Sequence, residues 1–248
     1  MTNRNADSQS QLGVRQFSAD TKMMAGYYSH YTHSAAYKLL NEKLLPGSLI
    51  ADIGAGEGAF SERLKVNGYN VVAVEKFCDF KPQDIKLYKL DLNDSWGGGI
   101  SEKLDGVVGI EIIEHIENPF NFLRQIRRIV KEDGWVIIST PNVLNFESRF
   151  NLFRNGVLDM MSHPDHRTPI FPQTMAKYCK ESGFEVVNRI IDIDTLSVRG
   201  STMKGKILRT IARAVRSLFS KDSYAVGNSN IWLLKPGKAN VYTPPPHA

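Results

Sequence analysis

The fold is indicated most clearly by residues 49–58, Leu49-Ile50-Ala51-Asp52-Ile53-Gly54-Ala55-Gly56-Glu57-Gly58. The first five of these residues are mostly apolar and follow the turn pair Pro46-Gly47, which is typical of a buried parallel strand. The three glycines can adopt positive φ and let a ligand approach the backbone, and residues 59–64 begin a helix whose free amides face that ligand. The stretch therefore predicts a strand, a tight turn and a helix that together bind a nucleotide.

An acidic residue follows the next predicted strand. Asn67-Gly68 ends the helix, and Tyr69 to Val74 forms a second strand that places Glu75 at its C-terminal edge. There the Glu75 carboxylate can accept hydrogen bonds from both hydroxyls of a ribose. This combination indicates a cofactor that contains adenosine.

Two adenosine cofactors fit the turn. The pattern Gly54-x-Gly56-x-x-Ala59 also satisfies the dinucleotide motif that allows Ala at its third place, so the turn alone is compatible with NAD. S-adenosylmethionine is favoured by Asp52, whose carboxylate could meet the methionine ammonium, and by Gly58, which completes Asp-x-Gly-x-Gly-x-Gly. The surrounding residues thus favour the methyl donor.

With these residues the chain resembles the class I S-adenosylmethionine-dependent methyltransferases. The resemblance covers roughly Leu49 to Val187 and continues in order through Val74-Glu75, Leu90-Asp91-Leu92, Ile112 to Pro119 and Ile137 to Asn142. It implies an enzyme with a doubly wound, mainly parallel seven-stranded α/β sheet whose last strand is antiparallel. It also implies S-adenosylmethionine as cofactor, in contact with Asp52, Gly54, Ala55, Gly56, Gly58, Glu75, Lys76, Asp91, Leu92, Ile110 and Glu111.

The role of Asp91 has two interpretations. In the family, an acidic or amide side chain at this place binds the exocyclic amine of adenine. A loop aspartate that caps the turn at Asn93-Asp94-Ser95 is the alternative. Two other functions also stay open for the whole chain, namely an NAD-dependent oxidoreductase and a non-catalytic protein that binds the cofactor or a membrane.

The remaining strands are predicted at residues 86–89, 104–110, 135–140, 184–193 and 230–234, and helices begin at Asn118-Pro119 and Phe171-Pro172. The segment after residues 104–110, Glu111 to Glu117, should lie at the carboxyl edge of the sheet beside the glycine turn. Methyltransferases that modify the adenine amino group carry an Asp or Asn, two prolines and an aromatic here. This chain has Ile110-Glu111-Ile112-Ile113, which disfavours a flipped base as acceptor.

The segment from Val143 to Pro169 is predicted to be the substrate loop, because long excursions from a compact domain are usually binding loops or lids. His166 and His115 are candidate general bases, since imidazole titrates near neutrality and a hydroxyl acceptor must lose a proton. His163, Asp165 and His166 form only a weak metal signal within one loop, and the sequence predicts no metal site.

A basic insertion occupies residues 194–228. Between Asp194 and Asp222 it has no acidic residue, and its positive side chains are Arg199, Lys204, Lys206, Arg209, Arg213, Arg216 and Lys221. The pattern is that of an amphipathic helix at residues 199–221, which would touch an anionic membrane surface, cover the substrate pocket, or simply pack on the domain. Much of the net charge of +5 comes from this segment, so nucleic acid is not expected as a partner.

The domain organisation follows from composition. We expect a disordered N-terminal segment at residues 1–20, one methyltransferase domain at 21–235 and a Pro-rich tail at 236–248. No apolar run approaches the roughly 20 residues that span a bilayer, so a cytoplasmic protein, with or without peripheral membrane contact, is expected. The two cysteines show no metal spacing. The expected acceptor is a small molecule, a glycan or a lipid-linked compound, methylated at oxygen.

Overall fold

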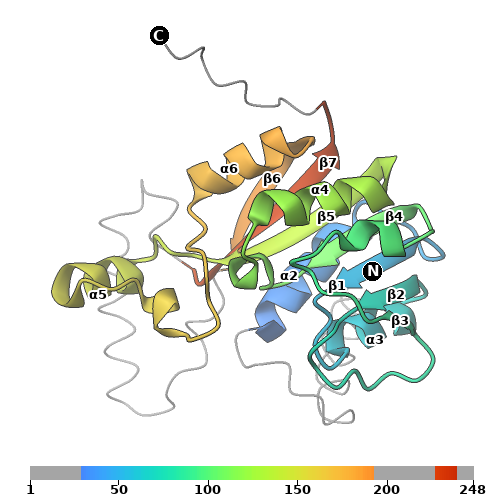
Figure 1. The fold of residues 1–248 in the computed structure, drawn as a ribbon, viewed down its shortest axis with the longest axis horizontal. Helices are drawn as coiled ribbons and strands as arrows, with labels where there is room; N and C mark the ends of the chain where they lie inside the picture. The colour runs from blue at the N-terminus through green and yellow to red at the C-terminus, as the bar shows by residue number, and fades with distance from the viewer. Residues whose placement is uncertain (1–28, 193–226, 239–248) are drawn as a thin grey trace, which may run out of the picture.

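The computed structural model describes residues 29–192 and 227–238, and these form one seven-stranded sheet with helices on both faces (Figure 1). The strand order is β3-β2-β1-β4-β5-β7-β6. The strands are β1 (Leu49–Ile53), β2 (Asn70–Val74), β3 (Lys86–Tyr88), β4 (Leu104–Gly109), β5 (Val130–Pro141), β6 (Phe184–Asp192) and β7 (Ser229–Pro236).

Only β7 runs against the other strands of this sheet. It pairs antiparallel with both β5 and β6, whereas the pairs among β1 to β5 are parallel. The chain leaves β1 toward β2 and β3 and then returns to β4 on the other side of β1. Ligands bind at such a reversal, outside the carboxyl ends of the strands. The predicted doubly wound sheet with an antiparallel last strand is confirmed.

The helices divide into two layers. Helices α2 (Ser29–Asn41) and α3 (Ala59–Val66) pack on one face, where Leu40 and Leu64 are buried, and α4 (Pro119–Ile129) and α6 (Pro172–Glu181) pack on the other, where Phe122 and Met175 are buried. The sheet is therefore apolar on both faces, as parallel sheets are. This rigid support fixes the loops at the carboxyl edge.

Two local expectations differ from the structure. The fifth strand was expected at residues 135–140, but β5 begins at Val130, directly after α4, because residues 130–134 continue alongside β4 through a register irregularity. The expected loop at Val143 to Pro169 contains α5 (Phe146–Asn155) and the 3-10 turn η3 (Asp159–Ser162). Asn145 caps α5 by accepting a hydrogen bond from the Ser148 amide at 2.7 Å.

Several domain predictions concern residues outside the described ranges. These are the N-terminal segment at 1–20, the insertion at 194–228 apart from its last two residues, and the tail at 236–248 apart from its first three. They stay predictions. Within the described ranges, no helix has the length and apolarity needed to cross a membrane.

Candidate active site

The glycine turn after β1 leaves an open space above Gly56. Gly54, Gly56 and Gly58 all have positive φ, of 72°, 56° and 96°. A Cβ at Gly54 would lie 2.5 Å from the Ile112 side chain, and one at Gly58 would lie 2.5 Å from Pro82, so these two glycines are required by packing. A Cβ at Gly56 would meet no protein atom within 4 Å. Other side chains therefore pack closely against Gly54 and Gly58, and the space beside Gly56 is left open for a ligand.

A hydrogen bond from the glycine turn to Glu75 connects the turn to the end of β2. The Glu75 carboxylate is buried, and its Oε2 accepts a hydrogen bond of 2.9 Å from the Gly56 amide. Its Oε1 accepts three more, from the amides of Lys76, Phe77 and Cys78. Glu75 was predicted to bind ribose hydroxyls, and its position beside Gly56 suits that role. The structure adds that the same carboxylate organises the turn.

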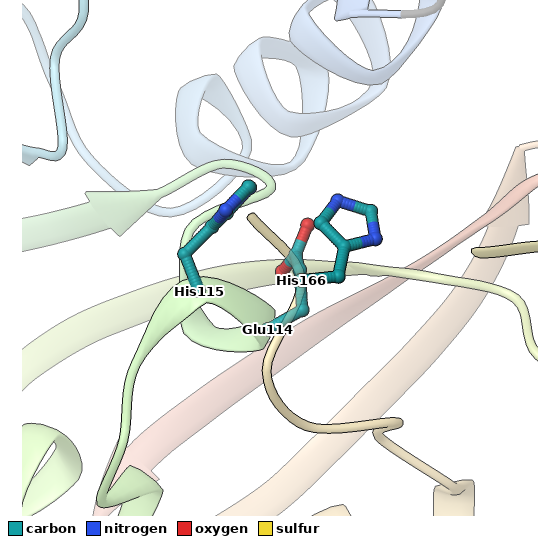
Figure 2. A group of neighbouring side chains, drawn as sticks. All are labelled: Glu114, His115 and His166. Atoms are coloured by element: carbon teal, nitrogen blue, oxygen red, sulfur yellow. The ribbon is translucent and has the colours of Figure 1, made fainter. Parts of the chain in front are cut away.

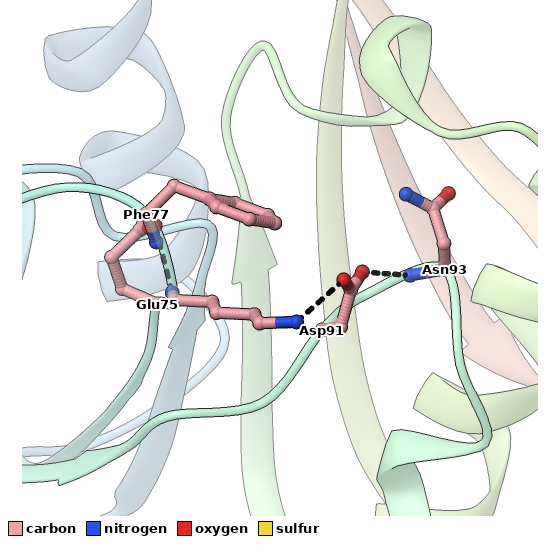
Figure 3. Close-up of polar contacts among 5 residues, drawn as sticks. Glu75, Phe77, Asp91 and Asn93 are labelled. Carbon is pink, nitrogen blue, oxygen red and sulfur yellow. Dashed lines mark hydrogen bonds and ion pairs between the residues drawn. The ribbon is translucent and has the colours of Figure 1, made fainter.

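Lys76 and Asp91 form an ion pair across the neighbouring loops (Figure 3), with Lys76 Nζ 2.9 Å from Asp91 Oδ2. Asp91 Oδ1 also accepts a hydrogen bond of 3.0 Å from the Asn93 amide. This bond, followed by the Lys76 ammonium, lowers the pKa of Asp91. Asp91 thus caps the turn at Asn93 in the structure, and its contact with adenine stays a prediction. Leu92 is buried and belongs to the hydrophobic core.

Asp52 is held beneath the turn by α3. It is 3% exposed, and its Oδ2 accepts a hydrogen bond of 2.6 Å from the Ser61 hydroxyl. Burial raises the pKa of Asp52 from its usual 3.8 to about 6, although the Ser61 bond opposes the shift. A contact between this carboxylate and the methionine ammonium stays a prediction.

A carboxyl group with a raised pKa makes stability depend on pH. The folded protein holds the Asp52 proton more tightly than the unfolded chain does, so ionised Asp52 destabilises the fold above pH 6 and costs nothing below pH 3.8. We expect Asp52→Asn to raise the free energy of unfolding above pH 6, by up to about 3 kcal/mol. Urea denaturation across this range measures the effect, and equal stability of both proteins above pH 6 would contradict it.

At the end of β4, Glu111 has an unusual backbone. Its φ is 50°, which is the left-handed region that L-residues with a Cβ avoid at a cost of about 1–3 kcal/mol. Its amide donates to Ser139 Oγ at 2.8 Å, and its Oε1 accepts from the same hydroxyl at 2.7 Å. Ser139 on β5 thus holds both the backbone and the side chain of Glu111. Ile110, also predicted to contact the cofactor, is partly buried and directly precedes Glu111.

Beyond Glu111, the 3-10 turn η2 (Ile113–His115) meets the segment that contains His166 (Figure 2). The Arg167 and Thr168 amides donate to the Glu114 carbonyl at 2.8 and 3.1 Å, which fixes the two segments together. The His115 and His166 ring centroids are 4.7 Å apart, and the Glu114 carboxylate lies beside them. We call Glu114, His115 and His166 the edge cluster.

Burial dominates the electrostatics of the edge cluster. Glu114 is fully buried, and burial followed by the nearby charge of Glu111 raises its pKa well above the usual range. Burial lowers the pKa of both His115 and His166. Both imidazoles are therefore neutral near pH 7, as a group that accepts a proton must be.

The two predicted bases, His115 and His166, come together in the structure, whereas Glu114 was missed. The signal for Glu114 was a glutamate next to a histidine at a carboxyl edge, but a single sequence does not tell which side chain of such a turn points inward. The expectation of no metal site considered only His163, Asp165 and His166. His163 stacks on His166 with ring centroids 4.7 Å apart, but among the described residues it is the edge cluster whose ligand atoms lie within 4.8 Å of one another.

Comparisons with known proteins agree with this geometry. A family model described as a methyltransferase domain matches residues 25–189. A ubiquinone biosynthesis O-methyltransferase of Dechloromonas aromatica is 27% identical over 190 residues, which are 69% of this chain and 80% of that protein. The enzyme of the same name in Pseudomonas aeruginosa is 26% identical, over 57% of this chain and 66% of its own length.

Solved structures show the same fold. A SAM-dependent methyltransferase from Archaeoglobus fulgidus aligns with a TM-score of 0.59 at 19% identity, over 85% of this chain and all of that one. Phosphoethanolamine N-methyltransferase 2 of Haemonchus contortus, in complex with S-adenosyl-L-methionine, aligns with a TM-score of 0.51 at 13% identity, over 91% of this chain and 60% of that one. The family match resolves the choice between NAD and the methyl donor, and the chain belongs to the class I S-adenosylmethionine-dependent methyltransferases.

Proposed function

We propose that this enzyme methylates a hydroxyl oxygen of a small-molecule, glycan or lipid-linked acceptor. The observation that carries the proposal is the place of the edge cluster. Ile112 directly precedes η2 and lies against Gly54, so η2 adjoins the glycine turn. Groups that can take up or direct a proton therefore lie next to the cofactor site. The names of the relatives, which are O-methyltransferases, also support oxygen as the acceptor atom.

The chain's own residues position the reactants. When bound, S-adenosylmethionine supplies a methyl group on a positively charged sulfur, which needs no further activation. Gly56 provides the space for it, and Glu75 provides a carboxylate for its ribose. Alignment of two reactants lowers a barrier by roughly 7–11 kcal/mol in the most favourable systems, so positioning supplies most of the catalysis.

The proton of a hydroxyl acceptor needs a recipient, and His115 and His166 are the proposed ones. A carbonyl oxygen can only accept a hydrogen bond, so the contacts of His115 Nδ1 with Asp165 O at 3.1 Å and of His166 Nδ1 with Met160 O at 2.7 Å place a proton on each Nδ1. The Nε2 atom of each neutral ring then carries the free electron pair.

The region expected to bind the acceptor has apolar surface. Among the described residues, Phe150 and Phe153 of α5 are 54% and 91% exposed, and Figure 1 shows α5 standing apart from the sheet. Exposed aromatic side chains of this kind suit an acceptor with an apolar portion. Contact of residues 199–221 with an anionic membrane would bring the enzyme to such an acceptor, and it stays a proposal from the sequence.

Label transfer tests the acceptor class. The protein is incubated with methyl-labelled S-adenosylmethionine and host extract, and the lipid, saccharide, small-molecule, protein and RNA fractions are counted, with excess S-adenosylhomocysteine as the control. We expect label in the lipid, saccharide or small-molecule fraction. An O-methyl ether resists alkali and releases methyl iodide in hot hydriodic acid. Label confined to protein or RNA, or methyl groups that resist hydriodic acid, would overturn the proposal.

A further inference from the structure

Glu114 has an unexplained environment. It is 0% exposed, and neither carboxylate oxygen has a hydrogen-bond partner among the described residues. Burying a carboxyl group without a partner costs several kcal/mol, and nearly all buried polar groups in proteins are paired. The second carboxylate at this edge, Glu111, lies close enough to interact with it electrostatically. A cation beside Glu114 would give its carboxylate the partner that the described residues do not supply.

The histidines beside Glu114 are oriented as metal ligands are. Each donates its Nδ1 proton to a backbone carbonyl, His115 to Asp165 and His166 to Met160. A hydrogen bond of this kind fixes the ring and leaves Nε2 available, and it accompanies almost every histidine that binds a metal. The two imidazoles come from η2 and from the segment before α6, so the site is built from two separate parts of the chain.

The distances among the three side chains fit one ion. One ligand atom each from Glu114, His115 and His166 lies within 4.8 Å of the others (Figure 2). Two ligands at about 2.1 Å from a common ion are at most roughly 4.2 Å apart, so a cation would draw these atoms slightly closer. Two imidazoles and one carboxylate suit divalent transition metals such as zinc, cobalt or iron better than magnesium or calcium.

We propose that Glu114, His115 and His166 bind one divalent transition-metal cation. With three protein ligands the cation keeps open positions, as catalytic metal sites do. Its role rests on the proposed function: a hydroxyl acceptor that coordinates the cation loses its proton to solvent water more easily. The oxygen then forms a bond to the methyl carbon, the carbon–sulfur bond breaks, and its electron pair stays on sulfur. With the cation bound, the two imidazoles are ligands, and the cation takes over the role in removing the proton that the free imidazoles have in the proposed function.

Cobalt titration tests the site without reference to catalysis. Protein treated with EDTA and desalted is titrated with Co²⁺, and the visible absorption of protein-bound Co²⁺ is followed before and after addition of Zn²⁺. We expect one Co²⁺ per chain, displaced by Zn²⁺. Glu114→Gln and His166→Asn should each weaken binding at least about 100-fold, because even partners of metal ligands contribute 10–100-fold.

His163→Asn is the matched control. His163 stacks on His166 and is exposed like a surface histidine, but it is not one of the three residues that place ligand atoms together. This variant should bind Co²⁺ like the wild type. Glu114→Gln is nearly isosteric, and an unchanged affinity for S-adenosylmethionine confirms that it folds. The proposal is overturned if wild type binds no Co²⁺, if Glu114→Gln binds it equally well, or if only His163→Asn loses it.

The outcomes separate this proposal from that of oxygen methylation. If Co²⁺ does not bind but label enters a methyl ether, the metal site is wrong and the acceptor class holds. If Co²⁺ binds through the edge cluster but label enters protein or RNA, the metal site holds and the acceptor class is wrong.

Discussion

Replacing Gly56 by alanine is expected to weaken the binding of S-adenosylmethionine by roughly 100-fold or more, which corresponds to about 2.7 kcal/mol. The expected loss of affinity comes from a steric clash with the cofactor and not from unfolding of the protein. A Cβ at Gly56 would meet no protein atom within 4 Å, so the methyl group would enter the volume assigned to the cofactor. Its φ of 56° adds a modest backbone strain of about 1–2 kcal/mol. Calorimetric titration measures the affinity, and thermal melting measures the stability.

Gly47→Ala is the control that separates the steric clash with the cofactor from the backbone strain. Gly47 also has positive φ, of 92°, and a Cβ there would also meet nothing within 4 Å, but it lies at the other end of β1. Both variants should therefore lose similar thermal stability, and only Gly56→Ala should lose the cofactor. If both variants bind S-adenosylmethionine as the wild type does, the cofactor does not occupy the space above Gly56.

Replacing Glu75 by alanine is expected to weaken cofactor binding about 10- to 150-fold and to lower the melting temperature. Hydrogen bonds to a charged group contribute about 1.5–3 kcal/mol, and the ribose bonds would be lost. The variant also deprives four backbone amides of their acceptor, those of Gly56, Lys76, Phe77 and Cys78. The turn should therefore lose its shape as well as its ligand contacts. Titration calorimetry and thermal melting report the two effects.

Glu57→Ala is the control for charge. Glu57 lies in the same turn and carries the same charge, but its carboxylate has no hydrogen bond to these amides. If negative charge alone attracts the cationic cofactor, both variants weaken binding alike. If the hydrogen bonds matter, Glu57→Ala changes little. An unchanged dissociation constant for Glu75→Ala would show that the ribose is bound elsewhere.

The fold and the glycine turn that binds the cofactor could be predicted from the sequence, because the residues that determine them are close together in the chain. A short apolar strand, three glycines and an acidic residue at the end of the next strand occur in one stretch of sequence, and each carries its own conformational signal. The start of β5 was not predictable in the same way. Glu132-Asp133-Gly134 has the composition of a turn, and only the pairing of Val130 with Leu104 extends the strand through it.

The edge cluster could not be predicted from neighbouring residues in the sequence. His115 and His166 were predicted as separate candidates, because the residues next to each in the sequence do not indicate that the two rings are in contact. Their contact depends on the Arg167 and Thr168 amides binding the Glu114 carbonyl, which is a tertiary interaction. Glu114 attracted no prediction because glutamate is usually exposed, and only the structure shows it fully buried. Lys76 and Asp91 were likewise predicted separately and form a pair.

A calorimetric titration tests whether the glycine turn binds the methyl donor. The wild-type protein is titrated calorimetrically with S-adenosylmethionine, S-adenosylhomocysteine and NAD under identical conditions. We predict that the first two bind at one site per chain and compete with each other, and that NAD displaces neither. Binding of NAD at the same site, with no binding of S-adenosylmethionine, would show that the turn is not a methyl-donor site.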